Sequence, residues 1–121
     1  MDLRENDPVE MYRREVAAVE PLTPQEESRL LKELRGAEAH CEFVKRRLIE
    51  HSLYLVLRIA ERHAMSGVSM LDLLQEGNLG LIRAVDHFSK NHEGDFSAYA
   101  ATCIEESISQ AIARSGKQPE G

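Results

Sequence analysis

The chain has 121 residues, 42% of them hydrophobic and 30% charged, a composition typical of one folded domain and not of a disordered segment. Its 15 basic and 21 acidic residues give a net charge of -6, which disfavours a protein that wraps duplex DNA through bulk positive charge. No apolar run is long enough for a membrane span and the first residues are too polar for a signal peptide, so we expect a cytoplasmic protein with its two cysteines reduced.

Helix signals follow one another along the chain, and no alternating apolar run supports a strand. Asp7 followed by Pro8 predicts the start of a first helix, because aspartate is a good cap and proline suits the first helical position. Pro21 ends this segment. Thr23 and Glu26 have the spacing of a capping box, in which each side chain accepts a hydrogen bond from the other residue's backbone N–H. They predict the start of a second helix.

Two further apolar patterns with helical period run over residues 37–50 and 53–64. Periodicity leaves open whether the join near His51 and Ser52 is a kink in one helix or a short break between two. The next helix is predicted over residues 70–88, with Ser69 as its cap.

The last part of the chain contains a polar stretch, residues 89–95, which predicts a loop. Ser97 is then the expected cap of a final helix that ends at about Arg114. The predicted fold class is therefore all-α, with a single compact domain of about six helices. A short tail, the helical domain and a second tail are expected at residues 1–6, 7–114 and 115–121.

The helix over residues 70–88 has more apolar surface than a single core contact requires. One stripe suits the core, and a second stripe at the same spacing mixes aliphatic with amide and carboxylate side chains. Such a mixture is typical of a surface that meets another protein, although burial on two sides within the same domain would also explain it. The core stripe consists of Leu74, Leu81, Val85 and Phe88, and the second of Leu71, Gln75, Asn78 and Ile82, flanked by Asp72, Glu76 and Leu79.

Two glycines, Gly77 and Gly80, lie in the interior of the same helix. Each costs about 1 kcal/mol relative to alanine at such a position. We expect a close crossing by another helix to offset this cost.

The chain resembles the central domain of the housekeeping-type bacterial sigma factors. The resemblance is carried by DLLQEGNLGLIRAVD at residues 72–86, by Phe88 and by FSAYA at residues 96–100. Upstream it is carried in the same order by DPVEMY, LTPQEE and KRRLIE, at residues 7–12, 22–27 and 45–50. It covers nearly the whole chain, from about Asp7 to Arg114.

The resemblance implies an all-helical transcription initiation protein that binds RNA polymerase core. In this family the helix matching residues 70–88 docks on the clamp helices, a coiled coil of the largest polymerase subunit. Carried over to this chain, the polymerase contacts would be Leu71, Asp72, Gln75, Glu76, Asn78 and Ile82.

The part of the family pattern that handles DNA does not carry over well. In typical members the loop and the final helix supply aromatic and basic side chains that flip and stack bases of the promoter's -10 element. Here Thr102 and Cys103 replace a tryptophan pair, and Glu105 and Glu106 replace an Arg-Gln pair. Because each aromatic stacking contact with a base is worth about 1–3 kcal/mol, we expect promoter opening to be weakened. Residual DNA contacts are expected from Lys90, Tyr99, Thr102, Glu106 and Gln110.

Several functional alternatives remain open from the sequence. The protein either guides promoter opening weakly, or occupies the clamp helices as a decoy or accessory regulator. It is otherwise an interaction module that meets an anti-sigma-like protein or a second copy of itself, although we expect a monomer when it is free. The chain ends where the resemblance ends, so it is either a short natural protein or a piece of a longer factor.

Catalytic and metal-binding motifs are missing from the sequence. The histidines and cysteines show no CxxC or HxxxH spacing, and no phosphate loop or nucleophile elbow occurs. We therefore expect no enzyme activity, no metal and no cofactor.

Overall fold

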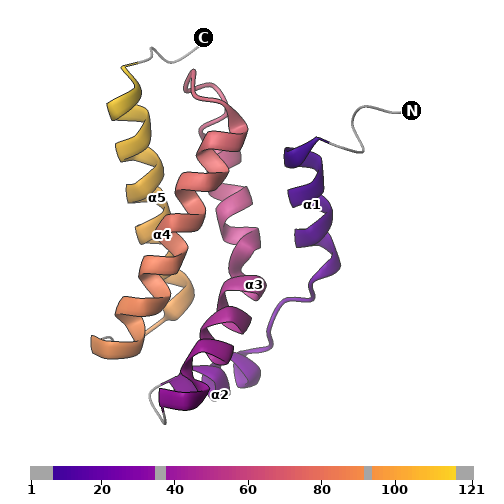
Figure 1. Cartoon of the computed structure of the whole chain (residues 1–121), viewed down its shortest axis with the longest axis vertical. Coiled ribbons are helices and arrows are strands. Elements are labelled where there is room, and N and C mark those ends of the chain that lie inside the picture. Colours follow the sequence, from indigo (N-terminus) through magenta and orange to yellow (C-terminus); the bar gives the residue numbers. More distant parts are fainter. Residues whose placement is uncertain (1–6, 35–37, 92–93, 117–121) are drawn as a thin grey trace.

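The computed structural model describes residues 7–34, 38–91 and 94–116, except for the side chains of residues 38–41 and 89–91. These residues form five helices and, within the described ranges, no strand (Figure 1). The all-α prediction is therefore confirmed. None of the helices in the described ranges is long and apolar enough to cross a membrane. The helices are α1 (Pro8–Ala18), α2 (Pro24–Leu34), α3 (Glu38–Arg62), α4 (Met70–Asn91) and α5 (Phe96–Ser115).

The open question at residues 51 and 52 is settled by α3, which continues through both of them. The helix contains neither proline nor glycine, and Leu48 and Val56 on either side of the join are fully buried. Ser52 itself is buried, and the His51 ring contacts the backbone carbonyl of Glu20 at 2.6 Å. One helix thus replaces the two predicted ones, which is why the domain has five helices and not about six.

The predicted starts of three helices are confirmed by their caps. The Val9 N–H donates to the Asp7 carboxylate at 2.9 Å, and the Asp72 N–H donates to the Ser69 hydroxyl at 3.2 Å. Both hydrogen bonds of the capping box at Thr23 are present, each at 3.1 Å. The hydrogen bond from the Thr23 backbone N–H to the Glu26 carboxylate is the largest cause of the lowered pKa of that carboxyl, followed by the Thr23 side chain.

The loop between the last two helices is shorter than predicted. Helix α4 continues to Asn91, and α5 begins at Phe96. Asp95, and not Ser97, caps α5, because its carboxylate accepts from the Ser97 N–H at 3.0 Å. The Ser97 hydroxyl instead donates to Glu27 of α2 at 3.3 Å, and so ties α2 to α5. Residues 1–6 and 117–121 of the predicted tails lie outside the described residues, whereas Ser115 is the last residue of α5 and Gly116 is its C-cap.

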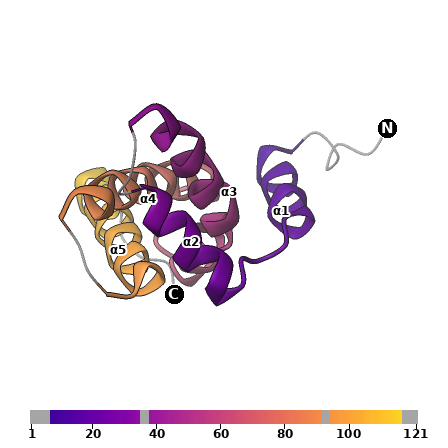
Figure 2. The same cartoon turned by 90° about the horizontal axis from the view of Figure 1, so that it is seen from below.

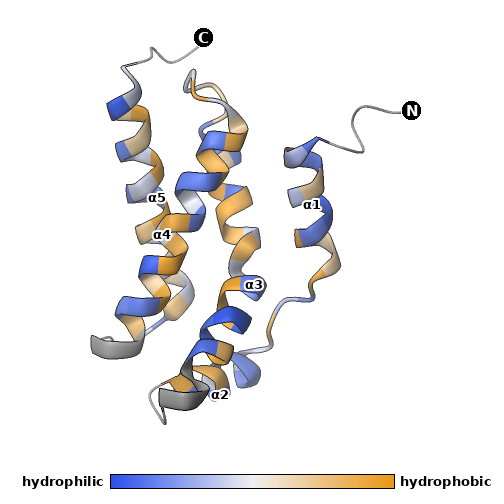
Figure 3. Ribbon diagram, in the orientation of Figure 1, coloured by the Kyte–Doolittle hydropathy of each residue, from blue (hydrophilic) through white to orange (hydrophobic). Residues whose placement is uncertain are grey.

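Helices α3, α4 and α5 surround most of the core, with their apolar residues gathered where they lie side by side (Figure 3). The predicted core stripe of α4 is buried. Helix α2 covers one end of the group and buries Leu30 and Leu34. Helix α1 lies to one side, next to α3, and has no fully buried residue (Figures 1 and 2).

The close helix crossing predicted from the two glycines is present. A Cβ atom at Gly80 would lie 2.9 Å from the backbone carbonyl oxygen of Cys103 and 2.8 Å from the Ser107 hydroxyl, both in α5. At Gly77 it would lie 2.7 Å from a methyl group of Val56 in α3. Helix α4 is therefore pressed against both neighbours over its central turn.

We expect Gly80→Ala to lower the free energy of unfolding by about 1–3 kcal/mol, because the added methyl group meets the backbone of α5 and forces the helices apart. Alanine's higher helix propensity, worth about 1 kcal/mol, offsets only part of this loss. Urea denaturation measures the change. Gly77→Ala is the comparison variant, with a smaller expected loss because it meets side-chain methyl groups. A gain in stability for Gly80→Ala would show that the crossing is looser than described.

Candidate functional site

Helix α4 has one side that none of its neighbours covers. Leu71, Leu79 and Ile82 are 37%, 49% and 42% exposed, and Asp72 and Gln75 between them are also exposed. Leu71, Gln75, Leu79 and Ile82 follow one another at steps of three or four residues, and Asp72 lies three residues before Gln75, so all five lie on one side of the helix. We call these residues, Leu71, Asp72, Gln75, Leu79 and Ile82, the outer face of α4.

The six residues predicted as polymerase contacts do not all lie on this face. Four of them do, but Asn78 lies toward α1, where its side-chain oxygen accepts a hydrogen bond from the Tyr12 hydroxyl at 2.8 Å. Glu76 lies toward α5, where its carboxylate is 3.5 Å from the Arg114 guanidinium. At about 100° per residue, positions 76 and 78 fall on opposite flanks of the line through Gln75.

Leu79 belongs to the outer face but was not among the predicted contacts. It is the most exposed of the three apolar residues there. The sequence signal that could have placed Leu79 on this face is its spacing, because it lies four residues after Gln75 and three before Ile82.

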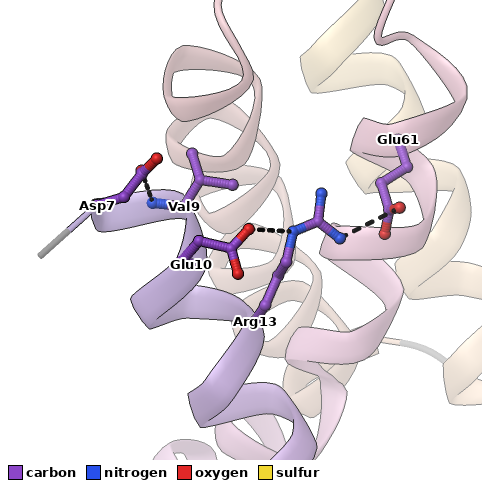
Figure 4. A network of polar contacts seen from close by, with 5 residues as sticks. All are labelled: Asp7, Val9, Glu10, Arg13 and Glu61. Atoms are coloured by element: carbon purple, nitrogen blue, oxygen red, sulfur yellow. Dashed lines mark hydrogen bonds and ion pairs between the residues drawn. The ribbon is translucent and has the colours of Figure 1, made fainter. Parts of the chain in front are cut away.

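Helix α1 packs Val9 and Tyr12 against the core and also makes polar contacts (Figure 4). Besides the cap at Asp7, the Arg13 guanidinium lies 3.6 Å from Glu10 in the same helix and 3.4 Å from Glu61 of α3. Tyr12 is the residue of α1 that reaches α4. Burial, and then the charge of Glu15, raise the pKa of the Tyr12 hydroxyl, so it remains a hydrogen-bond donor at neutral pH.

A groove of about 360 Å³ lies between α4 and α5. Three of the five predicted DNA contacts, Tyr99, Glu106 and Gln110, line this groove. Thr102 is not part of its lining, and its hydroxyl donates to the backbone carbonyl of Ala98 at 3.1 Å. The Lys90 side chain lies outside the described residues. The lining residues are Glu76, Arg83, His87, Tyr99, Cys103, Glu106, Ser107, Gln110 and Arg114.

Tyr99 is held within the groove by its neighbours. Its ring stacks on His87, with 5.9 Å between centroids and 27° between planes, and packs at a tilt against Phe88. Burial, followed by the Cys103 thiol and the Glu106 carboxylate, raises the pKa of the Tyr99 hydroxyl. The hydroxyl is therefore neutral at physiological pH.

Two arginines line the groove, and sequence reasoning had assigned neither to it. Both have partners within the domain: Arg83 donates a hydrogen bond to the Ser107 hydroxyl, and Arg114 pairs with Glu76. The two adjacent carboxylates of α5 diverge. Glu105 lies 2.7 Å from the His63 ring at the end of α3, and only Glu106 lines the groove. The groove therefore contains two arginines that already have partners, together with the carboxylates of Glu76 and Glu106. Among the described residues, no three acidic, histidine or cysteine side chains come together as metal ligands.

Comparison with known proteins identifies the region that contains the outer face and the groove. Residues 48–118 match the family model described as Sigma-70 region 2. A protein of a Bacillus species named RNA polymerase sigma factor SigA is 44% identical over 108 residues, which is 89% of this chain and 28% of that protein. The protein of the same name from Lactococcus lactis subsp. cremoris is 39% identical over 112 residues, 93% of this chain and 31% of that protein.

A third protein of that name, from Listeria monocytogenes, is 44% identical over 108 residues. This match covers 89% of this chain and 28% of that protein. The chain thus spans less than a third of each of these relatives.

Proposed function

Because the chain belongs to the Sigma-70 region 2 family, we propose that it binds the core enzyme of RNA polymerase and acts in transcription initiation. Its role is one of binding and not of catalysis, and it acts in the cytoplasm. The observation that carries this proposal is the outer face of α4, where three large apolar side chains lie in line with a carboxylate and an amide.

The outer face has the shape and chemistry of a helix-docking surface. Exposed Leu71, Leu79 and Ile82 form a ridge along α4, and ridges of this kind pack into the grooves of another helix. Asp72 and Gln75 supply hydrogen-bonding groups beside the apolar centre, as is common at protein interfaces. The proposed partner is the pair of clamp helices in the largest polymerase subunit.

Among the side chains that the structure describes, the other large exposed apolar ones do not form a comparable surface. Met11 lies in α1, Phe43 in α3 and Met65 in the turn after α3, each in a different segment of the chain. Single exposed hydrophobic residues are ordinary on protein surfaces, whereas a continuous row is not. This contrast supports α4 as the docking element.

We expect Leu79→Asp to weaken binding to purified polymerase core by at least tenfold, because it places a charge at the apolar centre of the outer face. Met65→Asp is the matched control, since Met65 is 57% exposed but lies in the turn after α3 and is not part of the outer face, and its binding should stay unchanged. Affinity is measured by fluorescence anisotropy of the labelled chain. Equal binding by all three proteins, or no binding by the unmodified chain, would rule out the proposed docking surface.

For the DNA side, we infer that the chain handles promoter DNA weakly. The groove between α4 and α5 exposes a carboxylate, Glu106, and its two arginines already have protein partners. Phosphates are attracted by cations with unsatisfied charge, and single-stranded bases by accessible aromatic planes. The Tyr99 ring is partly occupied by His87, so little stacking surface remains.

The same groove favours a second candidate function, namely a regulator that occupies the clamp helices without opening promoter DNA. The two candidates share the outer face of α4 and differ only in the use made of the groove. A chain that docks through another protein, such as an anti-sigma-like partner or its own copy, would instead show no affinity for polymerase core.

The weakness of DNA binding is tested by replacing Thr102 and Cys103 with tryptophan and Glu106 with glutamine. Glu105 is left in place because it pairs with His63. We expect this triple variant to bind a single-stranded -10 oligonucleotide about tenfold or more tightly than the unmodified chain, since aromatic stacking contributes about 1–3 kcal/mol per base. Fluorescence anisotropy at fixed salt measures the affinities.

Met65→Trp serves as the control for a tryptophan added elsewhere on the surface. Its affinity for the oligonucleotide should equal that of the unmodified chain. Micromolar, sequence-selective binding by the unmodified chain would contradict the inference that its DNA-handling surface is weak.

A further inference from the structure

Asn78 differs from the other predicted contact residues of α4, because a residue 66 positions away in sequence holds its side chain. The Tyr12 hydroxyl donates to the Asn78 side-chain oxygen at 2.8 Å, and lies 3.5 Å from the backbone carbonyl oxygen of Leu53. Tyr12 of α1 therefore contacts both α3 and α4. One hydroxyl thus connects three helices.

This hydrogen bond decides which end of the Asn78 amide faces which way. An asparagine side chain carries an acceptor oxygen and a donor NH₂ group on opposite sides of the same carbon. Because the Tyr12 hydroxyl occupies the oxygen, the NH₂ group is directed away from Tyr12. Asn78 is only partly buried, and it lies beside the outer face of α4.

The donor role of Tyr12 does not change with pH in the physiological range. Burial and the nearby Glu15 raise the pKa of its hydroxyl, so the proton is retained. The amide therefore keeps its oxygen toward the hydroxyl.

The position of Tyr12 depends in turn on α1. This helix has no fully buried residue, and its polar anchors are the Asp7 cap and the contacts of Arg13 with Glu10 and Glu61 (Figure 4). The placement of α1 is therefore linked to the orientation of a side chain at the edge of the docking surface.

We propose that Tyr12 is a positioning residue for partner binding: by holding the Asn78 oxygen, it presents the Asn78 NH₂ group to an acceptor oxygen of the docked partner. The inference rests on the proposed function, since the partner is the polymerase clamp. It adds to that function a contribution from α1, which lies outside the residues that match the family model. It also assigns the chemistry of the partner group, which is a carbonyl or carboxylate oxygen.

A double-mutant cycle tests the link between the two side chains. We expect Tyr12→Phe to weaken binding of the whole chain to polymerase core by about threefold to tenfold, the effect of one net hydrogen bond. In an Asn78→Ala background the same change should have no further effect on binding. An equal loss in both backgrounds would overturn the proposal, because Tyr12 would then act independently of Asn78.

Two more variants separate positioning from general stability. Asn78→Asp retains an acceptor for the Tyr12 hydroxyl but presents an oxygen where the NH₂ group was, so it should weaken binding at least as much as Asn78→Ala. Binding equal to that of the unmodified chain would disprove the assigned donor role. Tyr54→Phe removes a hydroxyl from another partly buried tyrosine, on α3, and should leave binding unchanged.

Failure of the proposed function gives a different result from failure of this inference. If the unmodified chain does not bind polymerase core, the docking surface itself is wrong, and the role of Tyr12 falls with it. If Leu79→Asp abolishes binding while Tyr12→Phe leaves it unchanged, the docking surface stands and only the positioning role is wrong.

Discussion

The close packing of α4 between α3 and α5 is the constraint on which the other features depend. Gly77 and Gly80 allow it, because any Cβ atom at these positions would meet Val56 of α3 or the α5 backbone at Cys103. Because two sides of α4 pack against α3 and α5, its remaining side faces solvent. The row of exposed apolar residues is therefore a consequence of how the helix is packed, and the domain presents that row on a rigid support.

The residues that flank the outer face of α4 also make contacts within the domain. Glu76 pairs with Arg114 and so joins the end of α5 to α4, while Asn78 is joined to α1 by Tyr12. Such contacts orient the side chains beside the outer face before any partner arrives. Binding then requires less ordering of side chains, which lowers its entropic cost.

On the side of α4 that faces α5, charged side chains interact with other groups of the same domain. Arg83 and Arg114 contact Ser107 and Glu76, and Glu106 remains in the groove. A nucleic acid would have to displace or share these internal partners before the arginines reached its phosphates. The two surfaces of α4 therefore differ in what they offer a partner: the outer face exposes apolar side chains, whereas the arginines of the groove already have partners within the domain.

Local signals were sufficient to predict the helix starts at Asp7, Thr23 and Ser69, because a cap involves residues only two or three positions apart. Helical period was sufficient for the buried stripe of α4, and the DLLQEGNLGL string for the family. These features depend on neighbours in sequence, which a single chain displays directly.

Other features depend on contacts between segments far apart in sequence, and only the folded chain decides them. Helix α3 runs through Ser52, which the folded domain buries, and the pairing of Ser97 with Glu27 leaves the cap of α5 to Asp95. Likewise, Glu76 pairs with α5 and Asn78 with α1 because of where those two helices lie. No pattern within α4 carries that information, since helical period gives the angle of a side chain but not the helix that it meets.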